Sequence, residues 1–162
     1  MRTSNWVDLF VLRHGIAQER SLEIDDGIRS LTNQGRIKAT RVIQRLKGLG
    51  IKADRIFTSP YKRALETAEI AFQEGLGYEL EISEDLEPLG DPFALLERLS
   101  SKSLFIGHEP NLSMLITKLI QSGESSISLK KAGFAHLRWS KDIVNPIGKT
   151  QLICLLKPSS LK

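Results

Sequence analysis

The sequence predicts an α/β fold with a mostly parallel, mixed sheet, in a single domain that spans residues 1–162. Short apolar runs, which are typical of buried strands, alternate with helical patterns over the first part of the chain. The last two apolar runs, Phe134 to Trp139 and Thr150 to Leu156, are joined by a turn with Gly148, which favours an antiparallel hairpin. A length of 162 residues with 41% hydrophobic residues suits one core.

The first predicted strand is Val7 to Leu12, and it ends abruptly in Arg13-His14-Gly15. Open α/β folds place their ligand sites at the carboxyl edge of the sheet. A polar loop follows up to about Ser30, and loops of that length are uncommon in compact domains unless they are functional. We therefore expect the loop to border a site.

Two helices and a strand come next. Thr32 is the predicted N-cap of a helix that runs to about Leu46, with its apolar residues at i, i+3, i+4 and i+7. Arg55 to Thr58 is the second predicted strand. Ser59-Pro60 then supplies an N-cap and an N1 proline for the next helix, which places Arg63 in its first turn.

The middle of the chain repeats this arrangement. Tyr78 to Ile82 is predicted to be a weaker edge strand, and Asp91-Pro92 opens a short helix. Ser103 to Ile106 is a compact buried strand that ends in Gly107-His108-Glu109-Pro110, and the helix after it carries apolar residues at core spacing. These are Leu112, Leu115, Ile116 and Leu119.

The composition excludes several classes of protein. A net charge of +4 is too small and too dispersed to indicate nucleic-acid binding, although it favours an anionic substrate. The only cysteine, Cys154, lies in an apolar run, so we expect a buried thiol in a reducing compartment. No apolar run approaches the ~20 residues that span a bilayer, and the expected location is the cytoplasm, without membrane contact.

Two of the three histidines stand beside glycine directly after predicted strands. Taken alone, His14 or His108 could have a purely structural role, but the two together indicate a site. His136 is not followed by glycine at a strand end, so a structural role is favoured there. Metal binding is the first alternative for the pair. Arg13 and Arg63 would repel a divalent cation, and no Cys or His spacing supplies further ligands, so we expect neither a metal nor another cofactor.

The same arginines suit a phosphoryl group. Its charge of about −1.5 to −2 and its several oxygens match guanidinium forks, and helices that start near Pro60 and Pro110 would add backbone N–H donors. A histidine can attack phosphorus through a neutral ring nitrogen, so that nucleophilic catalysis needs neither metal nor serine.

Three motifs, in this order, resemble those of the histidine phosphatase superfamily, which has the phosphoglycerate mutase-like three-layer α/β/α fold. They are Leu12-Arg13-His14-Gly15, the segment Thr58 to Ala68, and Gly107-His108-Glu109-Pro110. Arg29-Ser30-Leu31-Thr32 with Gly35, the loop from Leu86 to Asp91 and the short length are most similar to the SixA-type phosphohistidine phosphatases.

This resemblance implies roles for individual residues. His14 is the implied nucleophile, which forms a phosphohistidine intermediate. Arg13 and Arg63 are implied to bind the phosphoryl oxygens, and His108 completes the pocket. Arg29 matches a recurrent position of the SixA-type branch and supports the phosphate or the loop; a surface salt bridge is the alternative.

This sequence differs from the wider family at the positions near the RHG motif and in its general acid. Many members carry Thr and then Asn shortly after the RHG motif, where Ala17 and Arg20 stand here, and no glutamate is clearly placed as the acid. The candidates are Glu87, Asp85 and Glu19, each with a solvated loop carboxylate as its alternative reading. General acid catalysis is typically worth 10²–10⁴-fold, and it matters less for phosphohistidine, because imidazole is a better leaving group than an alkoxide.

The leading hypothesis is therefore a metal-independent phosphatase that acts on a phosphorylated histidine of a signalling or carrier protein and releases phosphate. A general small-molecule phosphomonoesterase of the same fold is the second hypothesis. A non-catalytic module that binds phosphoproteins is the third.

Overall fold

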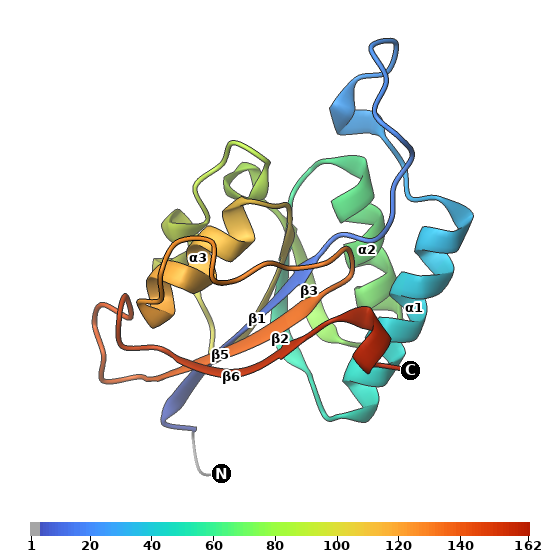
Figure 1. Ribbon diagram of the computed structural model, residues 1–162. Helices are drawn as coiled ribbons and strands as arrows, with labels where there is room; N and C mark the ends of the chain where they lie inside the picture. Colours follow the sequence, from blue (N-terminus) through green and yellow to red (C-terminus); the bar gives the residue numbers. More distant parts are fainter. Residues whose placement is uncertain (1–3) are drawn as a thin grey trace.

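The computed structural model describes residues 4–162, which form a six-stranded sheet with helices on both faces (Figure 1). The strand order is β3-β2-β4-β1-β5-β6. The strands are β1 (Trp6–Arg13), β2 (Ala53–Thr58), β3 (Gly77–Ile82), β4 (Lys102–Gly107), β5 (Phe134–Ser140) and β6 (Gln151–Leu156). Strands β1 to β4 run parallel and β5 and β6 form the antiparallel hairpin, so the predicted mixed sheet is confirmed.

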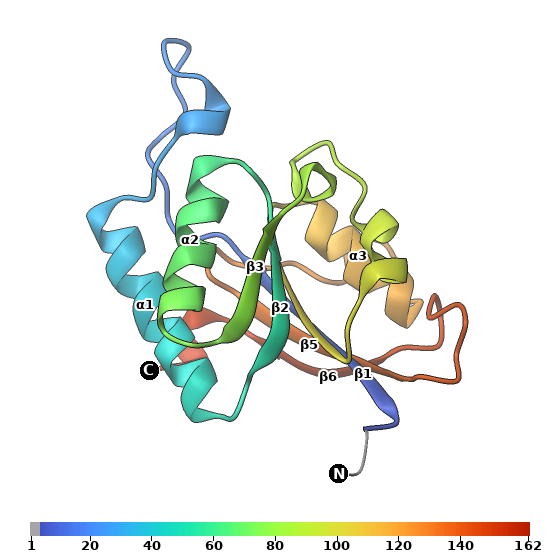
Figure 2. The ribbon, with the colours of Figure 1, turned by 180° about the vertical axis from the view of Figure 1, so that it is seen from behind.

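The helices complete three layers, as Figures 1 and 2 show from opposite sides. Helices α1 (Asn33–Gly48) and α2 (Lys62–Gln73) cover one face of the sheet. Helix α3 (Asn111–Ile120) and the 3₁₀ segment η3 (Pro92–Arg98) cover the other. The three-layer α/β/α architecture is thus the one expected of a phosphoglycerate mutase-like fold.

The central strand β1 supplies both halves of the core. Successive side chains of a strand point to opposite faces of the sheet. Phe10 and Leu12 therefore pack with residues of α1 and α2, while Leu9 and Val11 pack with residues of α3 and η3. All four are at most 3% exposed. This burial holds the carboxyl end of β1 firmly in the middle of the sheet.

The start of α2 differs from the prediction, whereas the start of α1 agrees with it. Thr32 Oγ1 accepts a hydrogen bond from the amide of Gly35, as an N-cap should. Helix α2 begins at Lys62, so Ser59 is not its N-cap and Pro60 is not its N1 residue. The Ser59 hydroxyl accepts a hydrogen bond from the amide of Tyr61 and also contacts the ring of His108.

One further expectation, the burial of Cys154, needs correction. Cys154 is half-buried rather than buried, because β6 is an edge strand whose side chains are alternately exposed and half-covered. Partial burial raises the pKa of its thiol. The short helix predicted after Asp91 is present as the 3₁₀ helix η3. Within residues 4–162, none of the helices combines the length and the apolarity that crossing a bilayer requires.

The polar loop after β1 projects from the body of the molecule beside α1 and α2 (Figure 1). Its two arms are tied together at their base, where the amide of Gln18 donates to the carbonyl of Ser30 and Ala17 forms a β-bridge with Leu31. The amide of Leu31 donates to a carboxylate oxygen of Glu66 on α2 at 2.7 Å. A short 3₁₀ turn, η1 (Asp26–Ile28), lies on the returning arm.

Candidate active site

Parallel pairing brings the predicted site residues to one edge of the sheet. Because β1, β2 and β4 run in the same direction, the residues that follow them meet at their carboxyl ends. His14 follows β1, Arg63 lies in the first turn of α2 after β2, and His108 follows β4. Together with Arg13 and Arg29 they line one pocket of about 320 Å³. The remaining lining residues are Ala17, Gln18, Glu19, Arg20, Pro88, Glu109 and Lys131.

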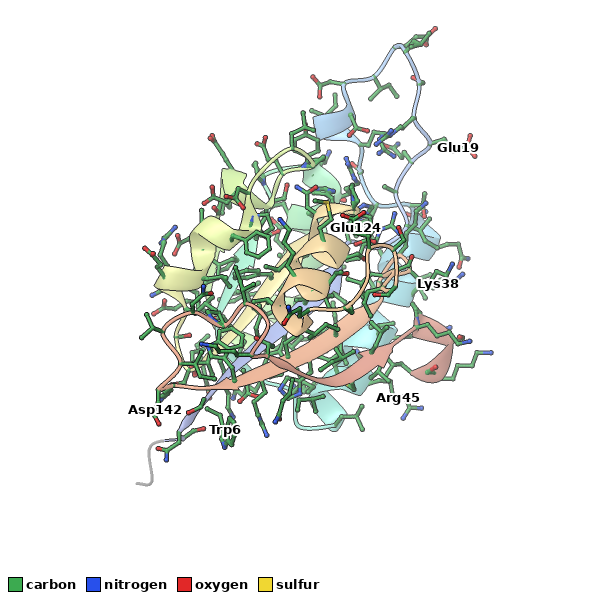
Figure 3. The ribbon with its side chains drawn as sticks, turned by 60° about the vertical axis from the view of Figure 1, so that its left-hand side comes forward. Trp6, Glu19, Lys38, Arg45, Glu124 and Asp142 are labelled. Atoms are coloured by element: carbon green, nitrogen blue, oxygen red, sulfur yellow. The ribbon has the colours of Figure 1, made fainter. Side chains whose placement is uncertain are left out.

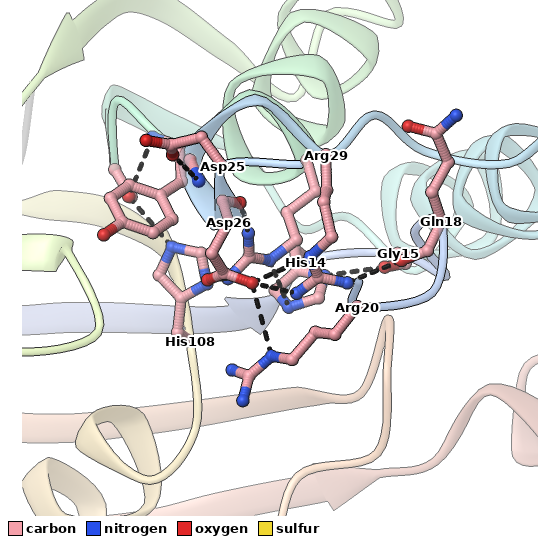
Figure 4. Close-up of polar contacts among 12 residues, drawn as sticks. His14, Gly15, Gln18, Arg20, Asp25, Asp26, Arg29 and His108 are labelled. Atoms are coloured by element: carbon pink, nitrogen blue, oxygen red, sulfur yellow. Dashed lines mark hydrogen bonds and ion pairs between the residues drawn. The ribbon is translucent and has the colours of Figure 1, made fainter. Parts of the chain in front are cut away.

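His14 presents an unprotonated ring nitrogen to this pocket. Its Nδ1 lies 2.7 Å from the carbonyl oxygen of Gly15, which can only accept, so the proton of the neutral ring is on Nδ1 (Figure 4). The other nitrogen, Nε2, then carries a lone pair. Arg63 Nε donates to this atom at 3.3 Å. This is the tautomer and the orientation that a nucleophilic imidazole needs.

The electrostatic surroundings keep the His14 ring neutral. Burial lowers its pKa from 6.5 to about 3, and the positive charges of Arg63, Arg13 and Lys131 act in the same direction. The Gly15 carbonyl opposes the shift only in part. At neutral pH the Nε2 lone pair is therefore available for attack.

We expect the His14 ring to stay neutral at mildly acidic pH. Because its pKa is lowered to about 3, lowering the pH from about 8 to about 5, a range over which a free histidine becomes protonated, should leave the ring without its second proton. Histidine ring signals followed by NMR during an acid titration test this, with the His14 signals assigned from their loss in His14→Asn. A His14 midpoint near the ordinary histidine value would contradict the expectation.

His108 lies beside His14 in the same wall. The two ring centroids are 5.1 Å apart, and His108 Nε2 is 2.9 Å from the hydroxyl of Ser59. Burial, followed by the nearby His14 and Arg63, lowers the pKa of His108 to about 3. Its Nδ1 and the Nε of Arg13 are buried and have no hydrogen-bond partner in the part of the chain that the structure describes. Unsatisfied buried polar groups are costly, and a phosphoryl oxygen would satisfy the Arg13 donor.

The two predicted phosphate-binding arginines are held in place by the backbone. Arg13 Nη1 donates to the carbonyl of Leu129 at 2.8 Å, and Arg63 Nη1 donates to the carbonyl of Asp26 at 2.7 Å. Arg63 is only 2% exposed, although it carries a charge. Thr67 links its helix to the RHG segment, because its hydroxyl accepts from the amide of Gly15 and donates to the carbonyl of Arg63.

Arg29 belongs to the pocket wall rather than to the surface. It is 8% exposed, and its Nη1 donates to the carbonyl of Gln18 at 2.6 Å. Its Nε donates to Asp26 Oδ1 at 2.8 Å. Arg29 thus ties together the two arms of the loop and also lines the pocket, and it forms an ion pair with Asp26.

The candidate acids separate into two groups. Asp85 accepts a hydrogen bond from Ser83, and neither Asp85 nor Glu87 lines the pocket. Glu19 does line it, at the base of the projecting loop, where Figure 3 labels it. Glu109 also lines the pocket, and sequence reasoning did not consider it. Its position directly after His108 in the third motif is the sequence signal that could have identified it.

At the start of α3, three of the backbone amides that we expected to be free are already bonded. The amide of Ser113 donates to Glu109 Oε1 at 3.1 Å, and the amides of Leu112 and Met114 donate to backbone carbonyls. The Ser113 hydroxyl also donates to Glu109. In this pocket the donors for an anion are therefore mainly arginine side chains. Among residues 4–162, no three His, Cys, Asp or Glu residues lie in a group that could hold a metal ion.

A second and larger cavity, of about 1050 Å³, lies between α1 and the last residues of the chain. Its lining is basic, with Lys38, Arg41, Arg45 and Lys130 among its residues, and Figure 3 labels two of these on α1. The lining contains no histidine and no carboxylate side chain. The phosphoryl chemistry expected from the sequence therefore fits the smaller pocket. The two cavities are lined by consecutive residues at one point, because Lys130 lines the larger one and Lys131 the smaller one.

Comparison with known families agrees with this geometry. Residues 9–89 match the model of the histidine phosphatase superfamily (branch 1), and they include the RHG motif, the first turn of α2 and Arg29. The chain belongs to the histidine phosphatase superfamily. Within the superfamily it is of the SixA type, as the following relatives indicate.

The chain is similar to SixA proteins over nearly its whole length. It is 26% identical to the phosphohistidine phosphatase SixA of Escherichia coli, over 86% of this chain and 96% of that protein. A solved structure of the protein histidine phosphatase SixA complexed with tungstate superposes with a TM-score of 0.81 at 25% identity, and covers 96% of this chain and all of the other. An uncharacterised protein of Picosynechococcus sp. is 35% identical over 96% of this chain. The family and the fold therefore both support phosphatase activity for this chain.

Proposed function

We propose that this histidine phosphatase removes the phosphoryl group from a phosphorylated histidine on a signalling or carrier protein, through a phosphohistidine intermediate on His14. The single observation that carries the proposal is the His14 ring itself. Its Nδ1–H donates a hydrogen bond to the Gly15 carbonyl, and its unprotonated Nε2 belongs to a pocket lined by four arginines, namely Arg13, Arg20, Arg29 and Arg63.

The reaction has two steps. In the first, His14 Nε2 forms a bond to phosphorus while the bond between phosphorus and the substrate imidazole nitrogen breaks, and the imidazole leaves as a neutral ring after taking one proton from solvent. In the second, water attacks phosphorus, the bond to Nε2 breaks and the neutral ring of His14 is restored. Inorganic phosphate leaves with one proton of the water, and the other proton passes to solvent. Arg13 and Arg63 hold the phosphoryl oxygens during both steps, where preorganised donors are most effective. No step requires a metal ion.

The placement of the acidic side chains supports a phosphohistidine substrate. Asp85 and Glu87 do not line the pocket, and the carboxylates that do, Glu19 and Glu109, are respectively exposed and bonded to Ser113. A poorly placed acid suits imidazole as the leaving group, because an alkoxide needs protonation more. The names of the SixA relatives point to the same substrate class. The basic side chains around the pocket and the neighbouring cavity favour an acidic protein partner.

The proposal predicts a strong preference for phosphoramidate bonds. We expect kcat/KM for a phosphorylated histidine-containing phosphotransfer domain to exceed that for a simple phosphomonoester by about 10²-fold or more, the lower end of what general acid catalysis contributes. Phosphate release should be measured for both substrates with a chelator present.

The opposite result distinguishes the alternative. A preference for the ester, together with loss of ester hydrolysis in Glu109→Gln, would contradict the proposal and identify a small-molecule phosphomonoesterase. Complete loss of activity with the chelator, restored by added metal, would contradict the metal-independent mechanism. Glu87→Gln is the matched control, because Glu87 does not line the pocket.

A further inference from the structure

Three arginines of the pocket converge on a single carboxylate, that of Asp26 (Figure 4). Arg29 contacts Oδ1 through Nε at 2.8 Å and through Nη2 at 2.7 Å. Arg63 Nη2 donates to Oδ2 at 3.0 Å, and Arg20 Nε lies 3.3 Å from Oδ1. Burial opposes ionisation of this carboxyl, but the hydrogen bonds and charges of Arg29 and Arg63 outweigh it and keep the pKa of Asp26 below its ordinary value.

The position of Asp26 on Arg63 is informative. The Nε and Nη2 groups of a guanidinium lie on the same edge and together form the fork that binds a carboxylate or a phosphate. On Arg63, Nε points to His14 Nε2 and Nη2 points to Asp26 Oδ2. The carboxylate oxygen thus shares an edge with the attacking nitrogen. A phosphoryl oxygen bound to that fork, with its phosphorus next to His14, would take the place of Asp26 Oδ2.

The same edge of Arg29 is also occupied, because its Nε and Nη2 both contact Asp26 Oδ1. Asp26 therefore binds to its arginines much as an anionic ligand would. Its side chain is 36% exposed, so it has room to move towards solvent. The carbonyl of Asp26 still accepts from Arg63 Nη1 at 2.7 Å, which leaves the arginine anchored if the carboxylate departs.

We propose that Asp26 is a specificity-determining residue that occupies the phosphoryl subsite until a group with more negative charge than a carboxylate displaces it. A phosphoryl group carries about −1.5 to −2 at neutral pH and offers three oxygens, whereas Asp26 carries one charge and offers two. A monoanion gains no charge advantage over Asp26 and does not displace it. The inference rests on the proposed role of His14 as the phosphoryl acceptor, but not on the identity of the leaving group.

If the Asp26 carboxylate only held the loop in place, removing it would leave phosphate binding unchanged or weaken it. The loop keeps other anchors without that carboxylate, because Arg29 still bonds Gln18 and Leu31 still bonds Glu66. Asp25, the neighbouring acid, provides a matched control. Its carboxylate accepts from the amide of Gly27 at 2.7 Å and does not contact the arginines of the pocket.

The test compares Asp26→Asn with Asp25→Asn, which remove the same charge at adjacent positions. The dissociation constants of inorganic phosphate and of vanadate should be measured by calorimetry, and formate should be tested as a monoanionic inhibitor. We expect Asp26→Asn to bind phosphate about tenfold or more tightly than the wild type, the scale of one lost charge-assisted competitor, and to become sensitive to formate. The KM of Asp26→Asn for the phosphorylated substrate should fall together with its dissociation constant for phosphate. Asp25→Asn should bind both anions as the wild type does.

Unchanged or weaker phosphate binding by a folded Asp26→Asn would overturn the proposal. A crystal structure of the wild-type protein with vanadate provides a test that needs no variant: we expect Asp26 to have left Arg63 and Arg29, and a complex in which it still contacts both would also overturn the proposal. Failure of the phosphohistidine hypothesis looks different, because it changes the ranking of phosphoramidates and esters but not the affinity for free phosphate.

Discussion

Replacing His14 with alanine is expected to abolish turnover, with a loss of roughly 10⁴-fold or more in kcat, the scale seen when an enzyme loses its nucleophile. Burial, together with the nearby positive charges, lowers the pKa of His14 and keeps its Nε2 unprotonated. His108 lies beside it, and its own Nε2 contacts the hydroxyl of Ser59. Steady-state phosphate release from a phosphorylated histidine domain measures the effect.

The wild-type intermediate provides the matching positive result. A brief reaction with radioactive phosphorylated substrate, stopped with denaturant at alkaline pH where the phosphorus–nitrogen bond survives, should leave label on the wild-type chain and none on His14→Ala. Peptide mapping should place the label on His14. Activity of His14→Ala near that of the wild type, or label on another residue, would refute the assignment of the nucleophile.

The strand ends of the site were predictable from sequence because each follows an apolar run that can only be a buried strand. Leu9 to Leu12 and Ser103 to Ile106 are almost fully buried, and both lead into a histidine next to a glycine. Once the strands are parallel, their carboxyl ends must meet. Local pattern and global topology agree at these positions, and this is why the pairing of His14 with His108 could be predicted without coordinates.

The charged lining of the pocket was harder to predict, because it depends on how a loop folds back. Asp26 and Arg63 are 37 residues apart and belong to no common periodic pattern. The spacing of Asp26 and Arg29 permits an ion pair but does not say that both side chains turn inward. Lys131, which precedes β5, also lines the pocket and has no such pattern in the sequence.

The misplaced start of α2 illustrates a competition between local and tertiary bonding. Ser59-Pro60 has the composition of a helix start, and the capping rule assumes that the serine hydroxyl is free to cap. Here the Ser59 hydroxyl accepts from the amide of Tyr61 and also bonds His108 from the neighbouring strand end, and the helix begins after Tyr61. The failed prediction therefore marks a residue that supports the second histidine of the site.

Replacing Arg63 with alanine is the second change with a large expected effect, a loss of about 10²–10³ in kcat, as for other transition-state donors to a developing charge. Arg63 uses all three of its nitrogens, towards His14 Nε2, Asp26 Oδ2 and the Asp26 carbonyl. A phosphoryl group held on its Nε and Nη2 lies directly in front of the nucleophile. Removing the side chain takes away both the charge and the orientation, so that kcat should suffer more than KM.

The lysine variant separates charge from geometry. Arg63→Lys keeps the positive charge, but an ammonium group cannot form a planar fork and reach all three partners, so we expect it to recover only part of the lost rate. Arg55→Ala is the matched control, because Arg55 on β2 pairs with Glu79 outside the pocket and should leave kcat unchanged. Melting temperatures of all three variants identify any that fail to fold, since Arg63 is buried. Full activity of Arg63→Lys would mean that charge alone suffices, and full activity of a folded Arg63→Ala would remove Arg63 from the mechanism.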